Sequence, residues 1–257
     1  MRCARSLGKG HFVILGSLTL LKTQNIHAAE PTQTAPEYYK NWTQINQYTS
    51  AETFESSGSF GTKLGIAYIN TGIPQPTDAA SNQVQLTDKI EDPQLPRTFT
   101  GISVSKGTSI PLDFGLTLAL ANQDHSTSQY GGHIQWTLIE NFRSPTLGIR
   151  LSRIETRGLS DVKNIRTDCI QIGSSYAPLP YVTISGSLGV ERNEWTLNDE
   201  TQLNLSERQL EPDRTTHRMA TLGIKIQPLT PFFTINFEKN YLVNFPSTQI
   251  IKLVILM

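Results

Sequence analysis

The feature that most constrains this chain is a regular alternation of large apolar residues with small or polar ones between Ser109 and Ile154. From Leu112 to Leu120 every second residue is large and apolar, and the pattern recurs over 130–138 and 147–151. A period of two is the side-chain period of a β-strand, because successive side chains point to opposite faces. Segments of roughly ten residues of this kind, separated by turn residues, are typical of a barrel with lipid outside and a polar interior.

The same alternation along the rest of the chain predicts about ten strands, with eight to twelve possible. We therefore expect an all-β fold, a single antiparallel up-and-down transmembrane β-barrel. The expected strands cover residues 59–70, 98–106, 112–120, 130–138, 147–151, 166–176, 181–192, 215–226, 232–238 and 249–257. The last segment, Gln249–Met257, is apolar on both faces, which leaves open whether it is a true closing strand.

The predicted connections differ in length between the two ends of the strands. Those at one end are polar and mostly long: Thr71–Arg97, Asn122–Gln129, Thr156–Ile165, Asn193–Arg214 and Lys239–Pro246. Those at the other end are short turns that contain Pro or Ser. Outer-membrane barrels have short periplasmic turns and longer extracellular loops, whereas a soluble sandwich has no reason to separate its loops by length. The pattern therefore favours an outer-membrane barrel.

The N-terminus has the features of an export signal, which we place at residues 1–29. Three basic residues precede an apolar run at 12–21 that is too short to span a bilayer, and cleavage after Ala28 is plausible. Residues 30–57 are polar and aperiodic, so we expect a flexible leader on the periplasmic side. The barrel domain is then expected over residues 58–257.

Composition argues against several classes of function. The chain has 22 basic and 22 acidic residues, and four of the basic ones precede Glu30, so the exported chain carries a net charge of −4. It has no basic excess that would favour nucleic acid as a partner. Cys169 is the only cysteine after the signal, so no intrachain disulfide is possible. No Cys/His spacing indicates a metal site, and we expect no cofactor.

Several ionisable residues fall on the polar face of the predicted strands, where we expect them to line the lumen: Lys63, Asp113, His133, Arg150, Glu191, Lys225 and Glu238. They can be paired charges that fill a narrow lumen, since lone buried charges are costly, or a selectivity lining for small solutes. A barrel of about ten strands is only slightly wider than the eight-strand size that side chains fill. This favours a largely closed lumen.

Aromatic residues cluster near the ends of the predicted strands, as expected for two interfacial girdles. The predicted girdle residues are Phe60, Phe114, Phe142, Tyr176, Tyr181 and Phe233 near the short turns, and Tyr68, Tyr130, Trp195 and Tyr241 toward the long loops. The ionisable residues on the apolar face also lie at proposed strand ends: Lys106, Glu140, Arg153, Asp168, Arg192 and Arg218. There a charge costs about 0–1 kcal/mol, against about 2–4 kcal/mol for Arg or Lys at mid-membrane.

One polar motif could be interpreted as catalytic. Asp124-His125-Ser126 lies in an expected outer loop, and His133, further along the next strand, could form a base–nucleophile pair with Ser126. Consecutive residues rarely point at a common reacting atom, so we expect loop polarity and assign no catalytic residue.

With these elements placed, the chain resembles the small outer-membrane β-barrel proteins of Gram-negative bacteria, and in particular uncharacterised barrels of Bdellovibrio-like lineages. The resemblance is carried by Thr98–Gly107, Tyr130–Trp136 and Pro145–Arg150, which are patterns of architecture. It implies residence in the outer membrane, with outer-membrane lipid, lipopolysaccharide and the barrel-assembly machinery as partners, and it implies no catalytic position. Such barrels usually end on an aromatic residue, whereas this chain ends on Met257.

We therefore expect an integral outer-membrane protein, either structural or a narrow passive pore for small solutes, with surface loops available for contacts. One alternative is an outer-membrane enzyme that acts on lipid or peptide. Another is a secreted soluble β-barrel that carries a ligand. The whole interpretation requires that Leu116, Trp136, Ile149 and Ile184 lie on the outside and not in a shared apolar core.

Overall fold

The computed structural model describes residues 43–47, 50–58, 61–73, 96–123, 126–141, 144–159, 162–197, 214–228 and 232–257. Ten strands cover most of them: β1 (Thr62–Asn70), β2 (Thr98–Gly107), β3 (Leu112–Ala121), β4 (Ser128–Asn141), β5 (Ser144–Arg157), β6 (Val162–Leu179), β7 (Val182–Leu197), β8 (Arg214–Ile226), β9 (Phe233–Leu242) and β10 (Thr248–Leu256). The predicted export signal (1–29), together with Phe60 and Phe142 of the predicted girdles, lies outside the described residues.

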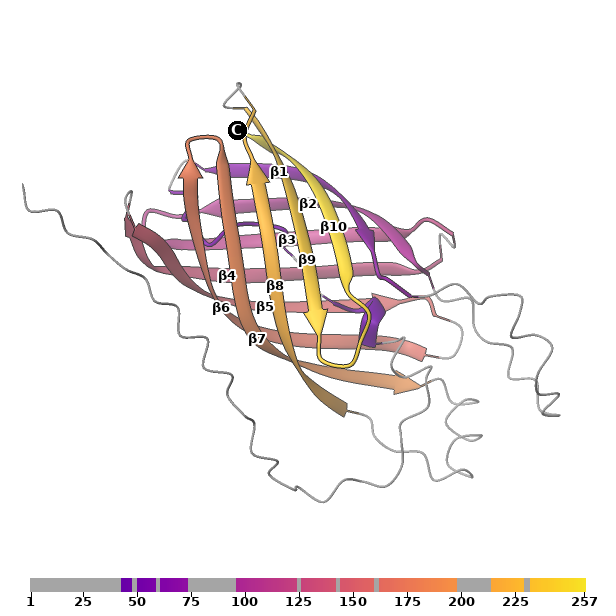
Figure 1. Ribbon diagram of the computed structural model, residues 1–257. Coiled ribbons are helices and arrows are strands. Elements are labelled where there is room, and N and C mark those ends of the chain that lie inside the picture. The colour runs from indigo at the N-terminus through magenta and orange to yellow at the C-terminus, as the bar shows by residue number, and fades with distance from the viewer. Residues whose placement is uncertain are drawn as a thin grey trace, which may run out of the picture. The chain divides into compact units, whose positions relative to one another are not determined.

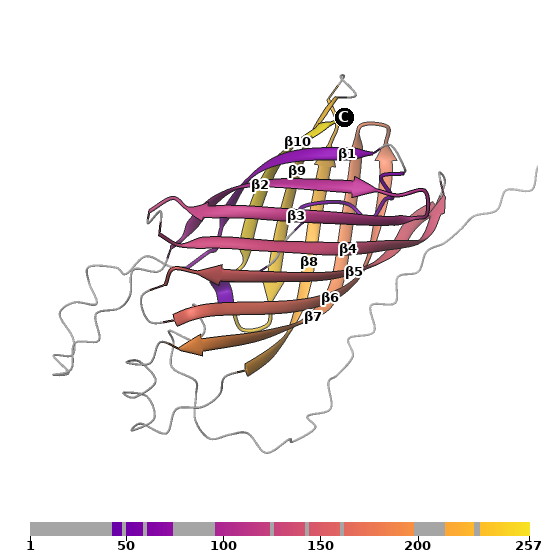
Figure 2. The ribbon, with the colours of Figure 1, turned by 180° about the vertical axis from the view of Figure 1, so that it is seen from behind.

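The strands form one closed barrel (Figure 1). Each strand pairs antiparallel with its neighbours in sequence, and β1 pairs with β10 over eight residue pairs, from Lys63 with Leu256 to Asn70 with Gln249. Figure 2 shows β2, β3, β4 and β5 following one another on one side of the barrel. The expected fold, a single antiparallel up-and-down barrel of about ten strands, is confirmed, and its tenth strand closes the sheet.

The two faces of the sheet follow the alternation in the sequence. Leu116, Trp136 and Ile184 lie on the outer face with 66%, 55% and 49% of their surface exposed, and Ile149 is half-buried on the same face. The residues between them point inward and are buried, for example Gln135 and Arg150. The apolar side chains therefore cover the outside of the barrel, while closure of the sheet pairs every strand edge.

Five strands are longer than the sequence predicted by three or more residues: β4, β5, β6, β7 and β9. β5 continues to Arg157, β6 begins at Val162 and β7 continues to Leu197, so the connection between β5 and β6 is short. Beyond the apolar band the alternation continues with charged residues, and Asp168 lies opposite Arg153 on β5 and Arg192 on β7. The expectation that these three residues mark strand ends is wrong, because cross-strand pairs of opposite charge extend the pairing.

The difference in connection length is therefore weaker than predicted, although it remains. The connections at residues 71–97 and 198–213 join strands at one end of the barrel, which we call the long-loop end. The short connections that follow β2, β4 and β6 join strands at the other end, which we call the short-turn end.

Candidate functional site: the lumen and the segment inside it

The barrel interior holds part of the chain's own N-terminal region. Residues 43–47 and 50–58, here called the lumen segment, begin with a helical turn at 43–45 and then continue without regular structure (Figure 1). All described residues from 43 to 54 are buried. We expected a flexible periplasmic leader over 30–57, but the structure places the described part of it, 43–47 and 50–57, inside the barrel, where the inner wall supplies polar and apolar partners.

The lumen segment runs from the long-loop end to the short-turn end. At the long-loop end, Gln44 Nε2 donates hydrogen bonds to the carbonyls of Thr71 and Pro246, at 2.6 and 2.5 Å. At the short-turn end, the backbone N–H and the hydroxyl of Ser57 both donate to Asp113 Oδ2, at 2.8 and 2.6 Å. The chain thus crosses the barrel before it enters β1.

The helical turn bridges opposite walls of the barrel. Gln44 contacts the β1 and β10 side, where its Nε2 also donates to Thr248 Oγ1 at 3.2 Å. Asn46 contacts the β5 and β6 side: its Nδ2 donates to Thr167 Oγ1 at 2.7 Å, and its Oδ1 accepts from Thr156 Oγ1 at 2.5 Å. Because β1 and β6 lie five strands apart in a ten-strand ring, these contacts tie the turn across the full width of the lumen.

Apolar contacts anchor the same end. Ile45 and Ala51 pack inside the barrel against residues of β1, β2, β3 and β10, including Phe99 and Ile250. These contacts explain why β10 is apolar on both faces. Its outer residues, such as Ile251, are exposed, whereas Ile250 faces the lumen segment.

A buried ionic cluster lies near the middle of the lumen. Glu52 Oε1 is 2.7 Å from Lys252 Nζ, and Glu52 Oε2 is 4.0 Å from both Lys63 Nζ and His133 Nε2. Ser105 Oγ also donates to Glu52 Oε1 at 3.2 Å. The side chains of Glu52 and Lys252 are only 7% and 4% exposed. A carboxylate so deeply buried is stable only with such partners.

Arg150 holds the backbone next to this cluster. Its Nη2 donates to the Glu52 carbonyl at 2.8 Å and to Gln135 Oε1 at 2.6 Å. Its guanidinium carbon lies 4.5 Å from the centre of the Phe54 ring, within the range of a cation–π contact. One inward arginine thus binds both the backbone and an aromatic side chain of the lumen segment.

Glycines on the inner wall make room for the Phe54 ring. An ideal Cβ added to Gly173 would overlap the ring, and one added to Gly148 would lie 3.2 Å from it. Phe54 itself is 2% exposed. The lack of side chains at these two positions creates the space that the ring fills.

A second ion pair lies closer to the short-turn end. Glu55 Oε2 accepts from Lys225 Nζ at 2.5 Å, with both side chains more than a fifth exposed. A space of about 50 Å³ lies beside Glu52, Lys63 and Lys225. It is large enough to hold water, since a polar cavity needs only about 10–15 Å³ of such space for one molecule.

The structure places all seven predicted lumen-lining residues on the inner wall. Lys63, Asp113, His133, Arg150 and Lys225 face the lumen segment through the contacts described above. Glu191 and Glu238 are also buried inside, and Glu191 accepts a hydrogen bond from Asn193 at 3.1 Å. The sequence did not predict the partners of these wall residues, which include Glu52, Phe54 and Glu55 of the lumen segment.

A signal for this network exists in the sequence. The predicted inner face is rich in glycine, with Gly65, Gly115, Gly148 and Gly173 on four different strands. So many missing side chains inside a narrow barrel leave space that another segment has to fill. The polar leader showed no periodicity, so it gave no indication of where it lies.

One predicted girdle residue is placed wrongly. Trp195 is 5% exposed and faces inward, because β7 continues past it and odd-numbered residues of β7 point to the lumen. The other described members lie on the outer face or at a turn: Tyr68, Phe114, Tyr130, Tyr176, Tyr181, Phe233 and Tyr241.

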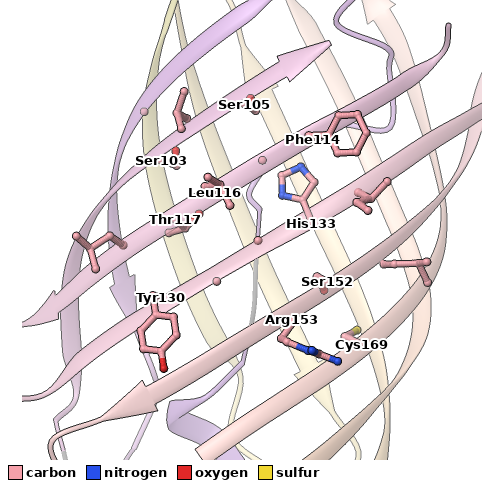
Figure 3. Close-up of a pocket in the computed structure, with 18 of the residues that line it drawn as sticks. Ser103, Ser105, Phe114, Leu116, Thr117, Tyr130, His133, Ser152, Arg153 and Cys169 are labelled. Carbon is pink, nitrogen blue, oxygen red and sulfur yellow. The ribbon is translucent and has the colours of Figure 1, made fainter. Parts of the chain in front are cut away.

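A broad concave region lies on the outside of the barrel. It has a volume of about 1,710 Å³, and most of its lining side chains are outward ones such as Leu116, Tyr130 and Arg153 (Figure 3). The inward residues His133, Ser152 and Cys169 border it from the same strands. It is a shallow depression in the outer surface, lined mainly by apolar side chains, and it offers few polar groups to a ligand.

The possible catalytic pair is not brought together. Asp124 and His125 lie outside the described residues. Ser126 is exposed at the long-loop end, where its hydroxyl donates to the Gly158 carbonyl at 3.3 Å. His133 is buried inside the barrel, seven residues further along, which is about 20 Å at roughly 3.3 Å per strand residue.

No group of three or more His, Cys, Asp or Glu side chains among the described residues could hold a metal ion. None of their helices is long and apolar enough to cross a membrane.

Comparison with solved structures finds other barrels at low similarity. The outer membrane protein Ail of Yersinia pestis in a phospholipid nanodisc is 12% identical, with a TM-score of 0.39, over 77% of this chain and 99% of Ail. Crystalline Ail with the heparin analogue sucrose octasulfate is 11% identical, with a TM-score of 0.30, over 76% of this chain and 97% of Ail. The outer membrane channel DcaP of Acinetobacter baumannii is 9% identical, with a TM-score of 0.28, over 63% of this chain and 52% of DcaP.

No protein-family model matches the chain, and no curated protein matches it. Functions do not carry over at identities of 9–12% and TM-scores below 0.4. The resemblance to barrels of Bdellovibrio-like lineages stays an expectation, and the function has to be argued from the lumen and the outer face.

Proposed function

We propose that this protein is an integral outer-membrane barrel of a Gram-negative bacterium with a structural role, kept closed to solutes by its own lumen segment. The observation that carries the proposal is the set of contacts of residues 43–58 with opposite walls. Gln44 and Asn46 bridge the long-loop end, Glu52 and Arg150 connect the middle, and Ser57 binds Asp113 at the short-turn end. A solute that crosses the lumen would have to displace the contacts at both ends and in the middle.

The outer face supports residence in a membrane. Large apolar side chains on all ten strands are exposed around the barrel, from Ile66 on β1 to Leu253 on β10. An exposed apolar surface this extensive is far larger than a soluble monomer tolerates, but it suits lipid. It argues against a secreted ligand carrier, as does a lumen filled by ionic and polar contacts.

Membrane fractionation tests this part of the proposal. We expect the chain in the outer-membrane fraction, with heat-modifiable mobility on a gel. Recovery in the soluble periplasmic or extracellular fraction would favour the ligand carrier.

Arginines above the apolar band suggest a contact with anionic lipid. The outer faces of β5 to β8 carry six arginines and only three acidic residues, and all nine lie toward the long-loop end. Arg153, Asp168 and Arg192 form one row across three strands, and Glu155, Arg166, Glu194 and Arg214 form the next row. Guanidinium groups bind phosphate in a bidentate manner, so we propose that these rows bind the phosphates of lipopolysaccharide.

A double variant tests the lipid contact. We expect Arg153→Gln with Arg192→Gln to lower the thermal stability of the protein in vesicles that contain lipopolysaccharide, and to leave it unchanged in phosphatidylcholine alone. Lys106→Gln, on the outer face at the short-turn end, is the matched control and should have no effect in either vesicle. Equal losses of the double variant in both vesicles would point to a purely structural role for the arginines.

Single-channel recording in planar bilayers tests the closed lumen. We expect no steady openings from the wild type, and openings from Phe54→Ala combined with Glu52→Ala, which removes two inner contacts of the lumen segment. Phe114→Ala, on the outer face, is the control and should stay closed. Steady wild-type openings whose ion preference changes on Arg150→Ala would instead establish a narrow passive pore.

A further inference from the structure

The inner wall binds the peptide backbone of the lumen segment as well as its side chains. Six wall side chains donate hydrogen bonds to its carbonyls: Gln129 to Ile45 (2.7 Å), Lys252 to Ser50 (2.9 Å), Asn236 to Ala51 (2.7 Å), Arg150 to Glu52 (2.8 Å), Gln135 to Thr53 (3.2 Å) and Thr137 to Phe54 (3.0 Å). These donors come from β4, β5, β9 and β10. Successive carbonyls from 50 to 54 are each bound, so the wall recognises a run of peptide groups.

The wall holds this backbone in a conformation that it would not favour alone. Ala51 has a φ of 46°, in the left-handed region that residues with a Cβ rarely adopt. Such a conformation persists when the surroundings determine it. Here the Ala51 carbonyl is held by Asn236, and the Ala51 side chain is packed against Ile45 and the β1 to β3 wall.

The side chains of the segment meet separate complementary pockets. Glu52 enters a pocket made by the cations Lys252 and Lys63 together with the His133 ring. Phe54 fills the gap over Gly148 and Gly173, under the guanidinium of Arg150. Glu55 meets Lys225. The wall therefore favours a short pattern: a glutamate, a buried threonine, an aromatic residue and a glutamate.

From these contacts we infer that the inner wall is a binding site for an extended acidic peptide of this pattern, and that the lumen segment is its tethered occupant. The inference rests on the proposed closed lumen and adds the kind of peptide that the inner wall recognises. Covalent attachment gives the segment a high local concentration, so a separate peptide of the same sequence competes only when the tether is cut.

The tether can be cut in the folded protein. Gly58 is exposed at the short-turn end, just before the chain joins β1. A protease site inserted after Gly58 allows the full chain to fold first and to be cut afterwards. The fragment that ends at Gly58 is then held only by the wall.

The experiment measures how the cut fragment leaves and what replaces it. We expect the fragment to co-elute with the folded barrel in detergent, and to leave at least tenfold faster when Glu52 and Glu55 are replaced by Ala. The emptied barrel should bind a fluorescent synthetic peptide of residues 43–58 saturably, whereas a peptide with both Glu→Ala changes should bind at least tenfold more weakly. The uncut protein should bind neither peptide.

Three results would overturn the inference. The first is that the wild-type and the Ala-substituted fragments leave the cut barrel at the same rate. The second is that the emptied barrel does not bind the wild-type peptide. The third is that cut and uncut proteins bind this peptide equally. Should the double Glu→Ala chain fail to fold, a Lys252→Glu barrel supplies the same test, because it should prefer a peptide with Glu52→Lys over the wild-type peptide. Steady channel openings of the uncut wild type would contradict the proposed closed lumen. They would leave the inferred peptide site standing, because peptide binding is measured separately.

Discussion

The inside and the outside of this barrel both carry ion pairs, but in very different surroundings. Inside, Glu52 and Lys252 lie 2.7 Å apart, and their side chains are 7% and 4% exposed. Outside, Arg153 and Asp168 lie 2.5 Å apart, with 59% and 37% of their side chains exposed. Distance alone would rank the two pairs as similar, whereas burial makes them different in energy.

The difference shows what each region does. A buried charge that loses its partner stays in a low-dielectric site, so the inner pair holds the lumen segment in place. An exposed pair is screened by water and salt, so it contributes little to stability. The outer pairs extend the sheet beyond the apolar band, whereas the inner pair fixes the interior.

The largest expected effect comes from breaking the inner pair. Glu52→Ala leaves Lys252 buried without its anion, and we expect it to lower the free energy of unfolding by about 3–5 kcal/mol. Urea unfolding in lipid vesicles measures the loss. Replacing both residues by Leu should recover most of it, because the pair is then removed as a unit. A loss below about 1 kcal/mol would show that the inner pair behaves like a surface pair.

A charge placed in the apolar band tests the outer face. Leu116→Arg puts a guanidinium in the middle of β3 among exposed apolar side chains, and we expect a loss of about 2–4 kcal/mol in a bilayer. Thr216→Arg is the matched control, because Thr216 lies beside Arg192 in the charged row, where the cost is about 0–1 kcal/mol. The same vesicle titration compares them, and equal costs would place the charged row inside the lipid.

Adding one methyl group tests the fit around Phe54. In Gly173→Ala the new Cβ overlaps the Phe54 ring, and we expect a loss of about 1–3 kcal/mol from overpacking. Gly186→Ala on the outer face is the control, since its Cβ would lie 3.6 Å from its nearest neighbours. Combining Gly173→Ala with Phe54→Leu should relieve the overlap. Identical unfolding curves for the two single variants would mean that the ring is not held against Gly173.

The smallest effect is expected from the outer pair. Asp168→Ala should change the free energy of unfolding by about 0–1 kcal/mol, and 1 M salt should reduce the difference further. Unfolding titrations at low and high salt measure both values. If Asp168→Ala lowered the free energy of unfolding as much as Glu52→Ala, and salt did not change that loss, the inner and outer ion pairs would not differ in energy.

Much of the barrel could be predicted from the sequence because its strands obey a local rule. The alternation in Leu112–Leu120 assigns each residue to a face, and each of the ten expected strands overlaps a strand of the barrel, although several are longer than predicted. The rule failed at Trp195, where a polar stretch of β7 continued as strand. Cross-strand partners such as Asp168 and Arg192 decide such extensions, and they are far apart in sequence.

The inward position of the seven lumen-lining residues followed from the same rule, but their partners did not. Glu52 meets Lys63, His133 and Lys252, which come from the two ends and the middle of the chain. The polar leader has no period that would show which of its residues meets which wall.

The sequence by itself determined which face of each strand is apolar and that the strands form a barrel, because side-chain direction in a strand depends only on position along the chain. Only the tertiary structure decided what fills the interior. Closure of the sheet between β1 and β10 sets the width of the lumen, and that width decides whether a segment from before the first strand fits inside.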